Sequence, residues 1–214
     1  MRRFHVLRSM VPLVLVVVLT GALQSGVKAQ GATPTADFIT PDPDECMVEP
    51  RSLEALTALA APSGAAATPQ AAAESTPSDL PTGGPADAET IAAVTATATE
   101  LFACYNANDL LRVFALFTDD YLERAFAAEG VTGEALGFFA APQAARPEEE
   151  RESVSVRDVQ VLPDGRVGAF LVVRNPAAAD SEAVDFTVFV EAEGRYLIDD
   201  VVFLTPGAIG TPTP

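Results

Sequence analysis

The sequence predicts an α+β domain over residues 89–204, with helices first and an antiparallel sheet after them. Two observations carry this prediction. Apolar side chains recur every three or four residues between residues 89 and 139, which is typical of helices packed by one face. From Val154 onward the apolar period changes to two, and turn sequences separate the apolar runs, which is typical of an antiparallel meander.

The helical part begins with a long amphipathic helix. Its apolar face consists of Ile91, Val94, Ala98, Leu101, Phe102 and Tyr105. The segment Asn106-Ala107-Asn108-Asp109 breaks this helix and caps a second one, over 110–117, that is apolar nearly all round. Thr118 caps a third helix that continues to Gly130, and Thr132 caps one more short helix.

The sheet part is expected to contain four strands. Residues 154–161 alternate, with one slip at Arg157-Asp158 that indicates a β-bulge. Pro163-Asp164-Gly165 predicts a hairpin turn. Residues 167–173 are apolar on both faces and therefore predict a central strand. Alternation over 184–191 and a last run over 195–204 complete the sheet.

Residues 1–29 are predicted to be a secretory signal peptide. Arg2, Arg3 and Arg8 precede an uncharged apolar run, and Val27 and Ala29 are the small residues that signal peptidase requires at positions −3 and −1. The apolar run is shorter than the roughly 20 residues that span a bilayer, so no stable membrane insertion is expected after cleavage. An uncleaved anchor is the alternative. The chain is expected to be secreted or extracytoplasmic, with cleavage near Ala29.

The segments around the domain differ from it in composition. Residues 30–45 form a polar spacer, and residues 46–60 contain a short helix with Leu53, Leu56 and Leu59 on one stripe. That helix is too short to be stable alone and is expected to dock on the domain. Residues 61–88 are rich in Ala, Pro, Ser and Gly and are predicted to be a disordered linker, and residues 205–214 a flexible tail.

Cys46 and Cys104 are the only cysteines. In an exported chain they predict one disulfide, with two free thiols as the alternative. Cys104 lies at the flank of the long helix's apolar face, where a separate covering segment would meet it. The disulfide would therefore tie the short N-terminal helix to the domain.

Removal of the leader changes the charge and the available chemistry. The leader carries four of the 13 basic residues, including Lys28, none of the 30 acidic ones, and the only histidine, His5, which leaves a net charge of −21. Phosphate backbones and anionic lipids repel such a chain, so no nucleic-acid partner is expected. Without imidazole, nucleophilic triads lose their usual base and zinc or copper sites their usual ligand. No cofactor and no metal site are expected, and only an all-oxygen calcium or magnesium site stays open.

Three segments carry a family resemblance. The chain reads Asn106-Ala107-Asn108-Asp109-Leu110 at the end of its long helix, then Ala115-Leu116-Phe117 with Asp119-Asp120, and its last strand opens at Gly194. In these segments and their order, residues 89–204 resemble the nuclear transport factor 2-like (polyketide-cyclase-like, SnoaL-like) superfamily. The resemblance implies a curved antiparallel sheet wrapped around three helices, with a cone-shaped pocket between them. It also implies a homodimer formed through the outer face of the sheet.

The resemblance also argues against inherited catalysis. The steroid-isomerase members of this superfamily place an oxyanion-stabilising tyrosine five residues before the Asn and a base aspartate near the end of this region. Leu101 and Ala125 stand at those positions here. Neither side chain can donate a hydrogen bond or accept a proton, so no catalytic residue is carried over.

Four polar residues are predicted to line the pocket: Tyr105, Tyr121, Asp185 and Asp200. Asp199 and Asp200 are neighbours on one strand, so their side chains are expected to point to opposite faces. The sequence favours an exported, non-catalytic protein that binds a small apolar ligand or acts as an interaction module. The alternative is an isomerase, dehydratase or hydrolase that uses these carboxylates and tyrosines on a small hydrophobic substrate.

Overall fold

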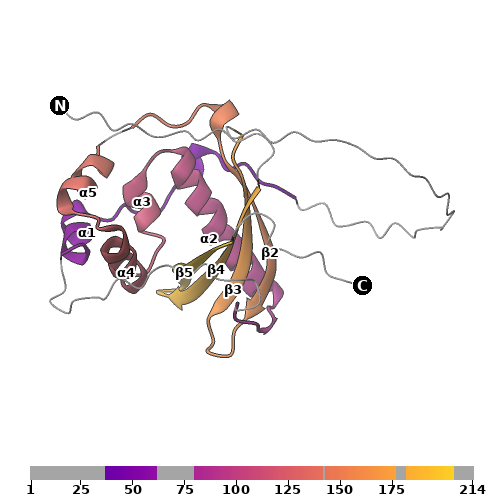
Figure 1. Cartoon of the computed structure of the whole chain (residues 1–214). Helices are drawn as coiled ribbons and strands as arrows, with labels where there is room; N and C mark the ends of the chain where they lie inside the picture. Colours follow the sequence, from indigo (N-terminus) through magenta and orange to yellow (C-terminus); the bar gives the residue numbers. More distant parts are fainter. Residues whose placement is uncertain (1–36, 62–79, 142, 177–181, 205–214) are drawn as a thin grey trace, which may run out of the picture. The chain divides into compact units, whose positions relative to one another are not determined.

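The computed structural model describes residues 37–61, 80–141, 143–176 and 182–204. These residues all lie in one unit, Ala36–Pro214. They form several helices and a five-stranded antiparallel sheet, of which β2 to β5 follow the helices (Figure 1), so the predicted α+β class is confirmed. The predicted signal peptide over 1–29 and the tail over 205–214 lie outside the described residues, as do residues 30–36 of the spacer and 62–79 of the linker.

The helices begin where the sequence supplies capping side chains. They are α1 (Leu53–Leu59), α2 (Ala88–Asn106), α3 (Leu110–Phe114), α4 (Asp119–Glu129) and α5 (Gly133–Phe139). In each case a Ser, Asp or Thr at the N-cap accepts a hydrogen bond from a backbone N–H of the first turn; these residues are Ser52, Asp87, Asp109, Thr118 and Thr132. Within the described ranges, no helix is long and apolar enough to cross a membrane.

The sheet has the strand order β1-β2-β3-β4-β5, with every neighbouring pair antiparallel. The strands are β1 (Gly84–Pro85), β2 (Ser153–Val161), β3 (Val167–Arg174), β4 (Glu182–Ala192) and β5 (Arg195–Leu204). The predicted bulge is present in β2, where the register shifts between Arg157 and Gln160 and Asp158 has a φ of 50°. A second register shift, opposite Val188 and Phe189, places Asp199 as an extra residue in β5.

Three segment predictions need correction. The end of the predicted linker, residues 80–88, instead contains β1, which pairs with β2, and the N-cap of α2. Part of the predicted spacer forms a β-bridge between Ile39 and Val154 and a 3-10 turn, Pro43–Glu45. The second helix ends at Phe114, because the following residues leave it to bridge β5 in parallel at Phe117 and Ile198.

Helix α2 lies along one face of the sheet and supplies the centre of the core (Figure 1). The main apolar cluster joins Val94, Ala98 and Leu101 of α2 to the side chains of β3 and β4 that point the same way, such as Ala169 and Phe189. Since strand side chains alternate, residues 167, 169, 171 and 173 of β3 face the helices, together with their register partners 183, 185, 187 and 189 of β4.

The N-terminal segment is fastened to this core, as the disulfide prediction requires. Cys46 and Cys104 are bonded, and both are buried. Leu56 of α1 is fully buried where α1 packs on α4 and α5. Arg51 donates hydrogen bonds to the carbonyl oxygens of Phe114 and Phe117, at 2.9 and 2.6 Å, and pairs with the carboxylate of Asp119. The arginine therefore binds backbone carbonyls at and just beyond the end of α3.

Asn106 joins three parts of the chain. Its side chain is fully buried and its amide nitrogen donates to the carbonyl oxygens of Pro41 and Glu152, at 3.0 and 3.1 Å. Its side-chain oxygen accepts a hydrogen bond from the Glu152 N–H at 2.9 Å. The last residue of α2 is thus bound to the N-terminal segment and to the entry of β2.

Loss of the disulfide is expected to lower the free energy of unfolding by about 4 kcal/mol. The bond closes a loop with a sequence separation of 58, and opening it restores that conformational freedom to the unfolded chain. Urea unfolding of Cys46→Ser/Cys104→Ser against the oxidised wild type measures this difference. Reduced wild type should match the double variant, and a loss below about 1 kcal/mol would contradict the assignment.

Replacement Asn106→Ala is expected to destabilise the protein by about 3 kcal/mol, because buried backbone groups of Pro41 and Glu152 lose their partners. Asn108→Gly is the matched control. Asn108 has a φ of 54°, which glycine adopts freely, and its amide makes one exposed hydrogen bond, to Ala144. Chemical denaturation should show less than about 1 kcal/mol for the control, and equal losses would refute the role of Asn106.

Candidate functional site

A cavity of about 300 Å³ opens between the C-terminal end of α2 and the neighbouring ends of β3 and β4. Its lining combines apolar and polar side chains: Phe102, Tyr105, Glu152, Val173, Asn175, Ala183 and Asp185. The volume is at the lower end of the range for small-molecule sites, and the mixture of an apolar body with a few polar groups is typical of them.

Local structure places the two predicted residues of this cavity. Tyr105 is in the last turn of α2, directly before the buried Asn106. Asp185 is on β4 opposite Leu171, so its side chain is on the sheet face that meets the helices. Tyr105 and Asp185, chosen from the sequence as pocket candidates, therefore line one cavity.

Asp185 is a carboxylate in an unfavourable place. Burial raises the pKa of its side chain from 3.8 to about 6, because a desolvated carboxylate loses hydration of its charge. Within the part of the chain that the structure describes, its carboxylate forms no hydrogen bond and no ion pair. The group is consequently free to meet a donor or a positive charge that enters the cavity.

Tyr105 faces the same cavity as a hydrogen-bond donor. Burial raises the pKa of its phenol to about 12, and the charges of Tyr121, Glu152 and Asp185 act in the same direction. At neutral pH the hydroxyl therefore keeps its proton. The ring packs against that of Phe102, with the two centroids 5.8 Å apart.

Glu152 and Asn175 complete the polar wall and were not singled out from the sequence. The Glu152 carboxylate accepts hydrogen bonds from Arg146 at 3.0 Å and from Asn175 at 3.2 Å. Its charge is thus neutralised within the protein. Glu152 follows the acidic run 148–150, and no pattern in the sequence distinguishes it from those exposed neighbours.

Tyr121 and Asp200, the other two predicted residues, do not line the cavity. The Tyr121 ring stacks on Phe117, with centroids 5.0 Å apart. Its pKa is raised by burial and then by the charges of Asp200 and Asp185, against an opposing effect of Arg124. The charges of Asp200 and Asp185 both act on the Tyr121 phenol, but in the register of β4 and β5 Asp200 lies opposite Val188 and not opposite one of the helix-facing residues of β4.

Asp199 has a structural role. Its carboxylate accepts hydrogen bonds from the Thr118 hydroxyl at 3.0 Å and from Arg166 at 2.9 Å, so it links the start of α4 to the β2–β3 turn. Asp199 is also the extra residue at the register shift in β5. The simple alternation expected for Asp199 and Asp200 therefore does not apply at this point of the strand.

Thr187 adds an unsatisfied polar group to the same sheet face. The residue is 1 % exposed, and in the described part of the chain its hydroxyl has no hydrogen-bond partner. It lies on β4 two residues from Asp185, on the face turned toward the helices. Most buried hydroxyls are hydrogen-bonded, so this region contains more unused polar groups than a purely structural core.

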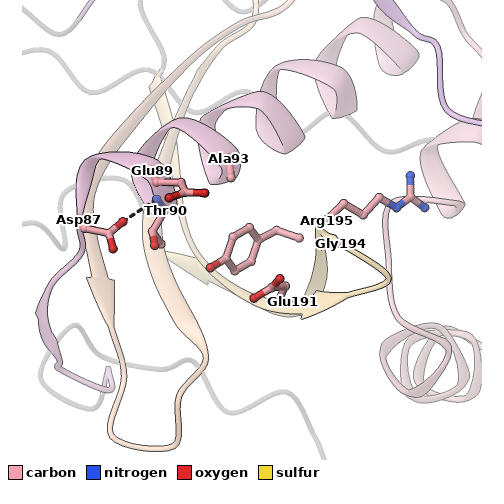
Figure 2. Close-up of a pocket in the computed structure, with 8 residues that line it drawn as sticks. Asp87, Glu89, Thr90, Ala93, Glu191, Gly194 and Arg195 are labelled. Carbon is pink, nitrogen blue, oxygen red and sulfur yellow. Dashed lines mark hydrogen bonds between the residues drawn. The ribbon is translucent and has the colours of Figure 1, made fainter.

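A second cavity, of about 230 Å³, lies between the first turn of α2 and the β4–β5 turn (Figure 2). Asp87, Glu89 and Glu191 contribute carboxylates. Asp87 already accepts the capping hydrogen bond from the Thr90 N–H at 2.8 Å, and Arg195 extends away, its guanidinium donating to the Ala115 carbonyl. These interactions account for Asp87 and Arg195 through the fold.

A third cavity, of about 320 Å³, lies between α3 and the end of α5, beside Pro50. Its charged residues are also engaged. Arg112 donates to the Cys46 carbonyl at 2.8 Å and lies 3.5 Å from the Asp109 carboxylate. The Nε atom of Arg112 is buried without a hydrogen bond in the described residues, but it is the atom that faces the Asp109 carboxylate in this ion pair. Of the three cavities, the one with Tyr105 and Asp185 is the one whose lining includes a partly buried carboxylate with no hydrogen bond and no ion pair among the described residues.

Among the described residues, no group of three or more His, Cys, Asp or Glu side chains is arranged to hold a metal ion. Comparison of the chain with protein-family models, curated proteins and solved structures finds no match. The geometry of the site is therefore the basis on which its function is argued.

Asp185→Asn is expected to stabilise the protein at neutral pH. The pKa of Asp185 is higher in the folded protein than in the unfolded chain, so the folded state binds more protons between pH 4 and 6 and wild-type stability falls as pH rises through this window. The gain in the variant should be about 1 kcal/mol at pH 7, because solvent screens a partly exposed charge, and should vanish near pH 4.

Urea unfolding across this pH range measures the effect, with Glu191→Gln as the control. Glu191 is an exposed acid on the same strand, and its replacement removes the same charge from the chain. A pH-independent difference between wild type and Asp185→Asn, or an equal effect of the control, would show that desolvation of Asp185 is not its origin.

Proposed function

We propose that this chain is a binding protein for a small, mostly apolar molecule that carries one polar head. The proposal depends on one cavity that both Tyr105 and Asp185 line. In the described residues, neither the Tyr105 hydroxyl nor the Asp185 carboxylate has a hydrogen-bond partner. Phe102, Val173 and Ala183 supply an apolar wall for the body of the ligand. The Tyr105 hydroxyl and the Asp185 carboxylate supply a donor and an acceptor for its head.

We also propose that the fold is of the nuclear transport factor 2-like kind. The order of helices before an antiparallel sheet, and a cavity between the end of the long helix and the sheet, support this assignment. Export is part of the same proposal. The disulfide between Cys46 and Cys104 fits an oxidising compartment, and the leader pattern over 1–29 fits secretion.

The outer face of the sheet offers less support for an interaction or dimerisation function. That face carries a second apolar cluster, formed by Leu162, Phe186, Val188 and Leu204, and these side chains are buried within the chain itself. Since they are already covered, they offer little apolar surface to a partner.

An isomerase, dehydratase or hydrolase is the second candidate. It is favoured by the pKa of Asp185, about 6, since a carboxyl that titrates near neutrality suits a general acid or base. The protonated Tyr105 would stabilise a developing oxyanion. Tyr121 and Asp200 do not line the cavity, so this mechanism rests on Asp185 and Tyr105 alone.

Binding is tested with 2-naphthol, a fluorescent apolar molecule with a single hydroxyl head. We expect saturable binding to the full chain with a dissociation constant of roughly 10 μM to 1 mM, as suits a ligand of this size. Ala183→Phe should abolish binding without loss of stability, because the larger ring fills the cavity from a position on the strand that tolerates aromatic residues.

Ala92→Phe is the matched control for this variant, since Ala92 is exposed on α2 and does not line the cavity. Fluorescence titration should give the wild-type affinity for the control. Unchanged binding to Ala183→Phe, or no saturable binding to the wild type, would refute a ligand site at this cavity.

A further inference from the structure

The charges around the cavity do not balance. Glu152 is paired with Arg146, their charged atoms being 3.0 Å apart, whereas Asp185 has no ion pair among the described residues. Arg124, the cation that acts on nearby Tyr121, donates its hydrogen bond to the carbonyl oxygen of Asp199. The cavity therefore holds one partly buried negative charge that the protein leaves uncompensated.

Several aromatic residues lie near this charge. Phe102 and Tyr105 line the cavity with it, and Tyr121 is close enough for the Asp185 charge to act on its phenol. On the other flank, β5 places Phe203 directly opposite Asp185 in the register, so the two Cβ atoms are about 4.5–5.5 Å apart on one sheet face.

Phe203 is unusual for its exposure. It is 72 % exposed, although it lies on the face of the sheet that packs against the helices. The face of an aromatic ring carries negative electrostatic potential, so the exposed ring of Phe203 can attract a cation that binds the neighbouring carboxylate. A positive group positioned between ring and carboxylate would be attracted by both.

We infer that the cavity binds a small organic cation of the alkylammonium class, with the ammonium group against Asp185 and the ring of Tyr105, and beside Phe203, the cross-strand neighbour of Asp185 that lies outside the cavity lining. Carboxylates attract such cations by charge and aromatic faces attract them through the ring quadrupole, most strongly where water is excluded. A neutral ligand would leave the Asp185 charge uncompensated, and an anion would be repelled by it. The inference rests on the proposed ligand-binding function and specifies the ligand's charge.

Isothermal titration calorimetry of the full chain with three molecules of the same shape tests the inference. The molecules are choline, its neutral carbon analogue 3,3-dimethyl-1-butanol, and the anion 3,3-dimethylbutanoate. We expect choline to bind at least about tenfold more tightly than the alcohol, and the anion to bind more weakly than both.

Two pairs of variants locate the effect. Asp185→Asn should reduce the affinity for choline to that for the alcohol, whereas Glu191→Gln, on the same strand, should leave it unchanged. Phe203→Leu should weaken choline binding several-fold by removing the ring, whereas Phe138→Leu should not, since Phe138 is equally exposed but lies on α5. Equal effects within either pair would overturn the inference.

The outcome separates this inference from the proposed function. If 2-naphthol binds but choline shows no preference over the alcohol, the cation assignment is wrong and the binding function stands. If neither 2-naphthol nor any of the three molecules binds, both are wrong.

Discussion

The arrangement of this protein depends on the buried side chain of Asn106. It binds the backbone of Pro41 and of Glu152, which precede and follow α2 in the sequence, and so holds three segments at the end of that helix. The same contacts build the cavity, because Tyr105 is the residue before Asn106 and Glu152 presents its side chain to the cavity wall. A buried amide with all these partners satisfied is directional, and it fixes the site where apolar packing alone would permit sliding.

The site is arranged at some expense of stability. Asp185 stays on the helix-facing side of the sheet although desolvation disfavours its charge, and Thr187 keeps a buried hydroxyl without a partner in the described chain. Stabilising interactions elsewhere offset this loss of stability. They include the disulfide at Cys46 and the hydrogen bonds of Arg51 to the carbonyl oxygens of Phe114 and Phe117. Polar groups that lack partners and lower the stability of the fold, in an otherwise well-stabilised structure, are typical of functional sites.

Much of the fold was predictable from local sequence, and the site less so. Caps, apolar periods and turns are local signals, and they predicted the helices, the bulge at Asp158 and the pairing of β2 to β5. Strand β1 was missed because its Gly-Pro sequence has no apolar period, and its pairing is set by β2. Tyr105 and Asp185 were recognisable as polar residues on apolar elements. The sequence did not show which carboxylate of the cavity is neutralised, because the ion pair between Glu152 and Arg146 is determined by the tertiary structure.

We propose above that this protein binds a small molecule in the cavity lined by Tyr105 and Asp185. Two-dimensional NMR of the isotope-labelled chain, titrated with small neutral, cationic and anionic aromatic fragments, tests it most directly. We expect the largest saturable shifts on the amides around Phe102–Tyr105, Val173 and Asp185. Shifts concentrated on the cavity beside Arg112 or on the one beside Glu191, or no saturable shift with any fragment, would contradict it.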